Sequence, residues 1–373
     1  MKLLIIDSYY PSFLRTFWQE HKDLQQQPYN KKLKGILSQC FGTADFYSHN
    51  LRELGHDVED FILNDISLCS SWAQENNLRI STLNIIDKIK MFPATHRFIG
   101  RPKIIQDIVM AKITASRPDV LYLQDLSLLN SKTLEKAKNH CHLIVGQIAS
   151  PLPGTGNLKQ LDLILTSFPH FVTKFRQMGI HSEYLKLCFE PRILKKIKHR
   201  KRIYDVTFVG SISPDHHKGT QLLEEISKEV PLGFWGNGEK YLPPGSPLRK
   251  CYRGEAWGID MYQILSQSKI LINRHISTAE NYANNMRLYE STGMGAMLIT
   301  DEKSNLNKLF RINKEVVTYK NAEELVSKIK YYLSHEKERE KIATAGQKRT
   351  LKEHNYLLRM KELIRLTKKY MKS

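Results

Sequence analysis

The sequence predicts an α/β protein made of two Rossmann-like domains, and three observations lead to this prediction. Short apolar runs, each closed by a polar residue, alternate with longer helical stretches along the whole chain. Strands of a parallel sheet that are buried on both faces have this appearance. A basic stretch with seven Lys or Arg between Arg192 and Arg202 interrupts the alternation once. A chain of 373 residues also exceeds the size of one ordinary core.

In the first half, apolar runs predict strands at residues 2–7, 119–124, 142–147 and 162–167. Amphipathic patterns between these runs predict helices, and two of them end at Gly55 and Pro118, residue types that commonly end a helix. The order of strands and helices favours a doubly wound parallel sheet.

In the second half, the predicted strands are residues 205–210, 231–236, 269–273, 296–300 and 315–319. Helices are expected over about 321–334 and through about 352, and an amphipathic basic helix is expected from about Tyr356. We expect an N-terminal domain, a basic linker, a C-terminal domain and a final helix, with ranges 1–190, 191–204, 205–353 and 354–373. Ligands of open α/β sheets bind at the carboxyl ends of the strands, so a ligand cleft between the two domains is expected.

The composition excludes several classes of protein. A hydrophobic content of 41% with 9% aromatic residues is too rich for a disordered chain. The apolar run at residues 3–6 is too short for a signal peptide, and no run of roughly 18 apolar residues could span a membrane. The five cysteines are scattered and form no C-x-x-C pair, so we expect reduced thiols in a cytoplasmic protein and no metal ligands among them.

The net charge of +19, with a pI near 9.5, is the compositional outlier. Such a charge attracts nucleic acid, anionic lipid or phosphate-bearing substrates. A lysine-rich surface that only keeps the protein soluble is the alternative explanation. The densest basic segments are residues 192–202 and the final helix, and these are where contact with an anionic membrane surface is expected.

The first two strands of the second half end in loops suited to a phosphate-bearing ligand. After the first strand, a glycine and a serine permit close backbone approach, and a histidine and a lysine open the next helix, whose N-terminus favours anions. After the second strand, a Trp-Gly pair leaves room for a flat ring against the backbone. The expected binding residues of these loops are Gly210, Ser211, His217, Lys218, Trp235 and Gly236.

The third strand of this series leads into NRHISTAENYANNMRLYESTGMG, residues 273–295. If a helix begins at about Asn284, then Asn284, Arg287 and Glu290 lie on one face at a spacing of three. This face offers a guanidinium and amides to a diphosphate, and a carboxylate to the hydroxyls of a ribose. An i,i+3 ion pair on a surface helix is the alternative. The expected binding residues of this segment are Asn273, Arg274, His275, Asn284, Asn285, Arg287 and Glu290.

Several other chemistries are not indicated by any motif. No complete G-x-G-x-x-G follows the first strand, so a dinucleotide oxidoreductase is not expected. Neither a P-loop nor a G-x-S-x-G motif occurs. His216 and His217 are adjacent, but the sequence indicates no third metal ligand, and we therefore expect no metal and no cofactor.

Several segments of the second half carry a resemblance to a known family, namely DVTFVGSIS, GEAWGIDMYQILSQSKILINRH, NMRLYESTGMGAMLITD and IATAGQKRTLKEHNY. They resemble bacterial GT-B glycosyltransferases of the family that includes the spore-maturation CgeB-like proteins, a glycosyl transferase group 1-like family. PSFLRTFW, FGTADFYSHNLRELGHD and GQIASPLP in the first half are also similar to this family, less diagnostically.

The resemblance implies transfer of a sugar, expected to be a hexose, from a UDP- or GDP-linked donor to a glycan, lipid-linked or protein acceptor. It implies that the C-terminal domain binds the donor, that the N-terminal domain mainly binds the acceptor, and that the final helix returns to the N-terminal domain. The metal-holding D-x-D motif of the other large fold of nucleotide-sugar transferases is missing. Arg287, Lys218 and helix N-termini are therefore expected to stabilise the leaving diphosphate in place of a divalent cation.

One position departs from the retaining members of related families. They carry a glutamate eight residues before the ribose-binding glutamate, and here Tyr282 stands eight residues before Glu290. An inverting enzyme instead needs a general base, expected in the N-terminal domain. The catalytic candidates are Asp125, then Asp7, together with Arg287, and Gln147 and Ser150 are expected to orient the sugar or the acceptor.

Two other functions stay open at this point. A scaffold that binds a nucleotide sugar without catalysis would use the same loops. An α/β protein that binds nucleic acid through its basic surface would interleave exposed aromatic residues with basic ones. The stretch 192–202 contains no Phe, Tyr or Trp, so the sequence disfavours the nucleic-acid function.

Overall fold

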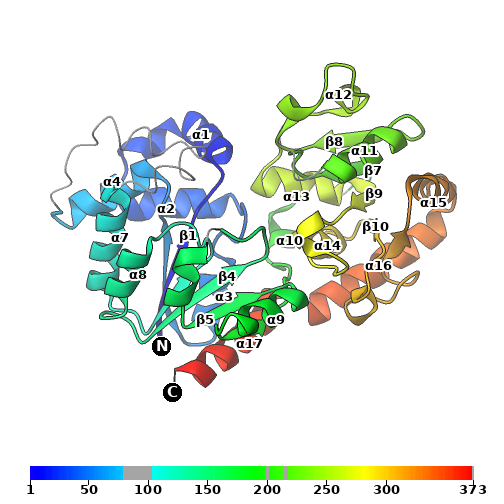
Figure 1. The fold of residues 1–373 in the computed structure, drawn as a ribbon. Coiled ribbons are helices and arrows are strands. Elements are labelled where there is room, and N and C mark those ends of the chain that lie inside the picture. The colour runs from blue at the N-terminus through cyan, green and yellow to red at the C-terminus, as the bar shows by residue number, and fades with distance from the viewer. Residues whose placement is uncertain (79–102, 154, 199–200, 214–216, 372–373) are drawn as a thin grey trace. The chain divides into compact units, whose positions relative to one another are not determined.

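The computed structural model describes residues 1–78, 103–153, 155–198, 201–213 and 217–371. The chain forms two compact units (Figure 1), the first made of residues 1–185 and 360–373 and the second of residues 186–359. The predicted linker therefore belongs to the second unit. A short helix, α10 (Ile193–Lys196), forms within it because Ile193 and Ile197 are buried.

The first unit contains a six-stranded parallel sheet with the strand order β2-β1-β3-β4-β5-β6. The strands are β1 (Lys2–Asp7), β2 (Asp57–Ile62), β3 (Val120–Leu123), β4 (Leu143–Ile148), β5 (Leu163–Thr166) and β6 (Ser182–Tyr184). The helices are α1 (Pro11–Glu20), α2 (Tyr29–Ser38), α3 (Phe46–Glu53), α4 (Ile66–Glu75), α7 (Lys103–Ser116), α8 (Ser131–Ala137) and α9 (Pro169–Gln177). The four predicted strands are present. The sequence analysis missed β2 and β6, which are the edge strands, because one carries several acidic residues and the other has only three residues.

The second unit contains a five-stranded parallel sheet with the strand order β11-β10-β9-β7-β8. All five predicted strands are present: β7 (Tyr204–Val209), β8 (Leu232–Trp235), β9 (Ser268–Asn273), β10 (Met297–Asp301) and β11 (Val317–Tyr319). The remaining helices are α11 (His217–Ile226), α12 (Leu248–Cys251), α13 (Gly258–Ser266), α14 (Met286–Gly293), α15 (Ala322–Ser334), α16 (Glu336–Glu353) and α17 (Tyr356–Tyr370).

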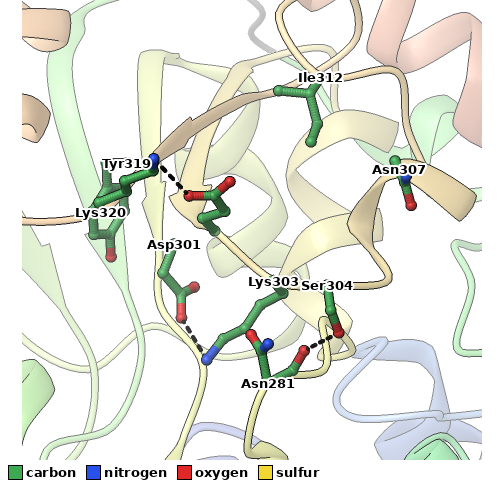
Figure 2. A pocket seen from close by; sticks show the side chains of 9 residues that line it. Asn281, Asp301, Lys303, Ser304, Asn307, Ile312, Tyr319 and Lys320 are labelled. Carbon is green, nitrogen blue, oxygen red and sulfur yellow. Dashed lines mark hydrogen bonds and ion pairs between the residues drawn. The ribbon is translucent and has the colours of Figure 1, made fainter.

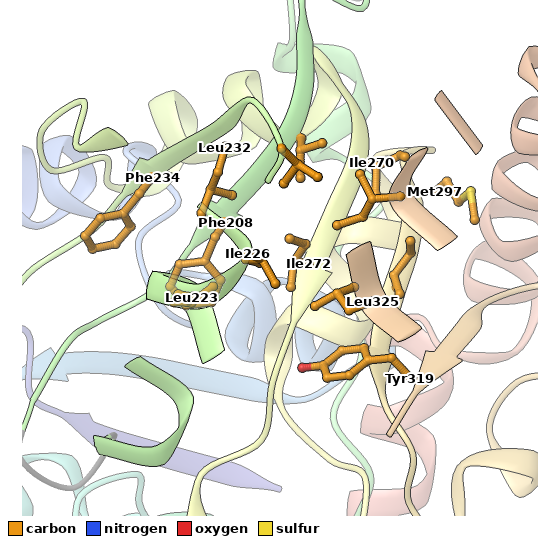
Figure 3. Close-up of a cluster of buried hydrophobic side chains, with 14 of the residues drawn as sticks. Phe208, Leu223, Ile226, Leu232, Phe234, Ile270, Ile272, Met297, Tyr319 and Leu325 are labelled. Atoms are coloured by element: carbon orange, nitrogen blue, oxygen red, sulfur yellow. The ribbon is translucent and has the colours of Figure 1, made fainter. Parts of the chain in front are cut away.

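The core of the second unit lies on one face of its sheet, under α11 and α15 (Figure 3). Alternate strand residues point to this face, as the period of two in a strand requires. The strands contribute Phe208, Phe234, Ile270, Ile272, Met297 and Val317, and the two helices contribute Leu223, Ile226, Leu325 and Ile329. Helices α13 and α14 pack against each other and against β9. Both faces of β9 are therefore covered, which is why three consecutive apolar residues, 270–272, stand in this strand.

The final helix, α17, begins in the second unit and belongs to the first unit from Met360 onward. Met360 and Leu363 are fully buried. The carboxylate of Glu183 in β6 lies 2.7 Å from Lys369 Nζ and accepts a hydrogen bond of 2.7 Å from the Tyr370 hydroxyl. Leu357, in the first turn of the same helix, is 38% exposed. Among the described residues, no helix is both long enough and apolar enough to cross a bilayer.

We expect the substitution Leu363→Ala to lower the free energy of unfolding by about 2–5 kcal/mol, because it leaves a cavity under a fully buried side chain. Leu357→Ala makes the same chemical change at an exposed position of the same helix and is expected to cost less than about 1 kcal/mol. Urea denaturation followed by circular dichroism measures both variants. An equal decrease in the free energy of unfolding of the two variants would contradict the packing of α17 through its buried face.

Candidate functional site

The strand order reverses once in each sheet, and ligands of open α/β sheets bind at the carboxyl edge of this point. In the first sheet the reversal lies between β1 and β3, and in the second sheet it lies between β7 and β9. The residues that follow these strands, including Asp7 and Asp125 in one unit and Ser211 and Arg274 in the other, are therefore the candidates for function.

Arg274 follows β9 directly, and its side chain reaches across to the end of β7. Its Nη2 lies 3.4 Å from the carbonyl oxygen of Ser211, and its Cζ lies 5.3 Å from the centre of the Phe208 ring. Arg274 is only 9% exposed, its Nε has no hydrogen-bond partner, and no carboxylate of the described residues forms an ion pair with it. Burial lowers the pKa of Arg274 to about 10, so the guanidinium stays charged at neutral pH.

The same guanidinium lies against the first turn of α11, which begins at His217. A Cβ atom placed on Gly219 would lie 2.2 Å from Nη1 of Arg274. The first N–H groups of a helix have no intrahelical partner and carry partial positive charge. Two groups that favour an anion thus meet at one place. The predicted side chains of His217 and Lys218 lie outside the part of the chain that the structure describes.

Glycines after β7 and β8 serve a different purpose from the one predicted. The N–H of Gly210 donates to the carbonyl of Trp235 over 3.0 Å, and Ile212 N–H donates to Asn237 over 2.8 Å. A Cβ on Gly236, whose φ is +150°, would lie 1.9 Å from the carbonyl oxygen of Gly210. The neighbouring loop, and not a flat ligand ring, therefore occupies the space beside Gly236.

The Trp235 ring also lies away from the strand end where it was predicted to bind. It packs against Tyr204 with ring centroids 4.9 Å apart, and it covers Gly233, where a Cβ would lie 2.6 Å from the indole. Both contacts are with residues earlier in the strands. The ring is 7% exposed and lies on the face of the sheet.

Helix α14 begins two residues later than predicted. Asn285 is its N-cap, and its Oδ1 accepts the N–H of Leu288 over 3.2 Å. The amide nitrogen of Asn285 donates to Asn273 Oδ1 over 2.8 Å, which ties the helix start to the end of β9. Asn284 is buried before the cap and does not share a helical face with Arg287. These asparagines hold the backbone of the site in place.

Arg287 and Glu290 form an ion pair, with 2.8 Å between Nη1 and Oε2. Arg287 Nε also donates to the carbonyl of Val209, the last residue of β7, over 3.1 Å. The other carboxylate oxygen of Glu290 accepts the Tyr262 hydroxyl over 3.3 Å. The side chains of Arg287 and Glu290 are only 17% and 5% exposed, so this is an i,i+3 pair within the fold and not on a surface helix. It connects α13, α14 and β7 at the switch point.

His275, the residue after Arg274, is held by Asp301 at the end of β10. Its Nδ1 lies 2.6 Å from Asp301 Oδ1, and its buried Nε2 has no partner. Burial acts to raise the pKa of Asp301, but the hydrogen bond from His275 and the charges of His275 and Lys303 hold it below its ordinary value. Within the described ranges, no three His, Cys, Asp or Glu side chains form a group that could hold a metal ion.

Asp301 also lines a polar pocket of about 630 Å³ at the carboxyl ends of β10 and β11 (Figure 2). Two lysines and two carboxylates contribute to it, so its charges balance. The lining residues are Asn281, Asp301, Glu302, Lys303, Ser304, Asn307, Ile312, Tyr319 and Lys320. The pocket does not include the residues at the β7–β9 switch point. Because Arg274 Nε and His275 Nε2 are buried there without a described partner, the switch point is a better candidate for a functional site than the pocket.

In the first unit, Asp7 and Asp125 lie close together but have different environments. Asp7 accepts the N–H of Ser8 over 2.7 Å, and burial raises its pKa to about 7, with a further contribution from the charge of Asp125. Asp125 accepts the Ser8 hydroxyl over 2.6 Å and both the N–H and the hydroxyl of Ser127, over 2.8 and 2.6 Å. A carboxyl with a pKa near 7 can exchange a proton at neutral pH.

The predicted sugar or acceptor residues differ in their surroundings. The side-chain oxygen of Gln147 accepts hydrogen bonds from Tyr47 and Tyr122, over 2.8 and 2.5 Å. These two bonds fix the orientation of its amide group. Ser150 is exposed after β4. The structure does not test a role for either residue in binding.

Four residues at the switch point of the second unit or beside it were not predicted, namely Phe208, Gly219, Tyr262 and Asp301. Asp301 could have been predicted from the sequence, because it directly follows a predicted strand. Gly219 was harder to predict, since the only indication is a glycine, an unfavourable helix residue, in a segment that otherwise reads as a helix start. Nothing in the sequence indicates Phe208 and Tyr262, because apolar and aromatic residues in a strand or helix normally belong to the core.

Comparison with known proteins supports the fold. The structure of HepE from Anabaena in complex with UDP-glucose has a TM-score of 0.63 at 11% identity and covers 99% of this chain and 100% of that chain. A glycosyltransferase from Rickettsia africae has a TM-score of 0.57 at 12% identity over 100% and 99% of the two chains. Sucrose-phosphate synthase from Thermosynechococcus elongatus has a TM-score of 0.57 at 8% identity over 99% of each chain. Such low identities establish a shared fold alone, and the predicted GT-B fold is confirmed.

A comparison with proteins of curated function finds no matching sequence. The model of the family described as glycosyl transferase-like matches residues 193–365, which include most of the second unit and the start of α17. The finer CgeB-like assignment stays a prediction. The chain thus has the GT-B fold, and its residues 193–365 match the model of the family described as glycosyl transferase-like.

Proposed function

We propose that the protein transfers a sugar from a nucleoside diphosphate sugar to an acceptor, and that the diphosphate binds at the ends of β7 and β9 beside the first turn of α11. The observation that carries this proposal is the buried guanidinium of Arg274, which forms no ion pair with any carboxylate in the described part of the chain. A buried cation next to the positive end of a helix is unfavourable unless an anion joins them. A diphosphate supplies that anion, and its negative charge grows as the sugar leaves, so the same groups stabilise the transition state.

Two comparisons support a nucleotide-sugar donor. The second unit contains most of the segment that matches the glycosyl transferase-like family. HepE, which shares the fold, was crystallised with UDP-glucose and also with UDP and glucose. We propose a UDP- or GDP-linked hexose as the donor.

Arg287 and Glu290 are proposed to complete the donor site. Arg287 already contacts the last carbonyl of β7, so a small rotation of its guanidinium would bring it to a diphosphate bound there. A carboxylate has about four lone-pair positions, and the protein donors to Glu290 leave capacity for a ribose hydroxyl.

A metal-free mechanism is supported by the missing D-x-D motif and by the cationic residues at the strand ends. In this mechanism, Arg274, Arg287 and the N-terminus of α11 neutralise the leaving diphosphate. The cations replace the divalent ion that other nucleotide-sugar transferases hold between carboxylates.

For an inverting reaction we propose Asp7 as the general base, ahead of Asp125. A base works best when its pKa lies near the operating pH, and burial raises the pKa of Asp7 to about 7. Asp125 is engaged by the Ser8 hydroxyl and by two donors of Ser127. Tyr282 in place of the expected glutamate favours inversion over retention.

The acceptor class and the contact with an anionic membrane surface stay predictions from the charge of the chain. The exposed side of α17 carries Lys361, Arg365, Lys368 and Lys369, opposite its buried apolar side. A scaffold without catalysis would bind the nucleotide sugar but release no nucleoside diphosphate in the presence of any acceptor. The nucleic-acid function gains no further support, because no row of exposed aromatic residues in the described part of the chain accompanies these basic side chains.

We expect Arg274→Met to raise the Kd for UDP or GDP by at least about tenfold, because it removes a charge-assisted contact while it keeps an unbranched apolar stem. Isothermal titration calorimetry measures this change. Lys330→Met, at an exposed lysine paired with Glu229 in the same unit, removes one positive charge elsewhere and should leave the Kd unchanged.

The titration is run in EDTA and repeated with Mg²⁺. Binding of the same strength in both conditions agrees with a metal-free donor site. Binding that appears only with Mg²⁺ would contradict that part of the proposal. If neither nucleotide binds wild type in either condition, the donor function itself is wrong.

Glu290→Gln is expected to weaken UDP binding by roughly tenfold, because a neutral amide is a poorer acceptor for ribose hydroxyls than a carboxylate. Inorganic pyrophosphate has no ribose, so its affinity should change little. Arg274→Met should instead weaken both ligands. A lower melting temperature of Glu290→Gln with unchanged UDP affinity would show that Glu290 only holds α14 to α13.

Asp7→Asn is expected to stabilise the protein increasingly as the pH rises from about 4 to about 7. The folded-state pKa of Asp7 is raised to about 7, so wild type is most stable below the unfolded-state value near 3.8 and loses stability as the pH rises through 7. An amide in this position has no charge to bury. The difference in melting temperature between variant and wild type, measured across this pH range, should grow and then level off.

Asp57→Asn, at an exposed position of β2, serves as the matched control and should show no such trend. A difference between Asp7→Asn and wild type that stays constant with pH would mean that Asp7 does not titrate in this window, and it would remove the support for Asp7 as the base.

A further inference from the structure

Gly219 is the third residue of α11, and the space beside it is occupied by Arg274. A Cβ on Gly219 would lie 2.2 Å from Nη1, 2.6 Å from Cζ and 2.5 Å from Cδ of that side chain. The backbone conformation there does not require glycine, because its φ is not in the left-handed region. Glycine inside a helix is less favourable than alanine. The helix therefore carries this cost at a position where a side chain would displace the guanidinium.

The other side of the guanidinium is defined by Phe208. The Cζ of Arg274 lies 5.3 Å from the centre of this ring, within the range of a cation–π contact. The ring stands where a side chain of Gly210 would be, since a Cβ there would lie 2.8 Å from its Cζ atom. Phe208 is 5% exposed and belongs to the core under α11 (Figure 3), so its orientation is fixed by packing.

These contacts form a slot for one side chain. On the helix side, the missing side chain of Gly219 leaves space for the guanidinium, and on the sheet side the Phe208 ring bounds this space. The carbonyl oxygen of Ser211 lies 3.4 Å from Nη2 at its end. An arginine that is free in solvent loses rotamer entropy when a ligand fixes it. In this slot the restriction is imposed by folding, so ligand binding does not bear that cost.

We propose that Gly219 and Phe208 are positioning residues that hold the Arg274 guanidinium ready for the diphosphate of the donor. The inference rests on the proposed function, because it takes Arg274 to be a donor-binding residue. It adds that the affinity of the site depends on two residues that do not themselves contact the ligand, one of them through the absence of a side chain.

Gly219→Ala tests the first of these residues. The clash falls on the mobile end of a side chain, and alanine favours the helix, so the variant should fold and keep a melting temperature close to that of wild type. Its Kd for UDP should rise about tenfold, because the guanidinium is forced out of the slot. Gly245→Ala is the matched control, since Gly245 is exposed and nothing lies within 4 Å of its Cβ position.

A double-substitution cycle separates positioning from a general disturbance of α11. In the Arg274→Met background, Gly219→Ala should have no further effect on the Kd for UDP, because the guanidinium that it displaces is already gone. Phe208→Leu should follow the same pattern, weakening UDP binding in wild type and not in Arg274→Met. If the effects of either substitution and of Arg274→Met on the free energy of UDP binding add in full, the positioning role is wrong.

The failure of the inference can be distinguished from the failure of the proposed function. If Arg274→Met binds UDP like wild type, the donor role of Arg274 is wrong. If Arg274→Met weakens UDP binding while Gly219→Ala and Phe208→Leu bind it like wild type, the donor role stands and the positioning role is wrong. Inorganic pyrophosphate, titrated against the same variants, should show the same pattern, because the slot acts on the diphosphate alone.

Discussion

Parallel strands can be joined only by segments that cross back over a face of the sheet, and this constraint determines where chemistry is possible in both units. Because every crossover returns to the same end, all strands of one sheet end at one edge. Residues distant in sequence then meet there. Arg274 lies beside the carbonyl of Ser211, 63 positions earlier, and the Ser8 hydroxyl reaches Asp125 across 117 positions. Both meetings occur at the point where the strand order reverses, where no direct crossover blocks access.

Buried polar atoms at the end of β9 fall into two groups. Asn273 and Asn285 have partners for their side-chain groups and fix the start of α14. The next two residues after Asn273 are different, because Arg274 Nε and His275 Nε2 are buried and have no hydrogen-bond partner among the described residues. Buried unsatisfied polar groups are rare in folded proteins and usually have a functional explanation. The position of these two nitrogen atoms at the switch point agrees with a site in which they bind a ligand.

The two carboxylates of the first unit show how environment separates residues of the same type. Asp7 and Asp125 follow neighbouring strands, yet one is desolvated and the other is surrounded by hydroxyl and amide donors. Desolvation favours the protonated form of a carboxyl, whereas donated hydrogen bonds favour the ionised form. Because burial raises the pKa of Asp7 to about 7, Asp7 can exchange a proton near neutral pH. The assignment of a base therefore depends on contacts that strand position alone does not reveal.

The sequence by itself determined the α/β class, nine of the eleven strands and the strand ends that carry the candidate residues. It did so because strands buried on both faces require continuous apolar runs. The edge strands β2 and β6 were not predicted, since an edge has less apolar surface to bury. The start of α14 was misplaced because either of two consecutive asparagines could cap it, and only the contact with Asn273 selects Asn285. Tertiary structure alone decided that the glycine after β8 accommodates a neighbouring loop and that Arg287 and Glu290 form an ion pair. It also decided that Arg274 lies between Phe208 and Gly219, where no carboxylate of the described residues pairs with it. Each of these outcomes depends on which side chains and backbone atoms come within a few ångströms across the sheet, and the chain order does not specify such distances.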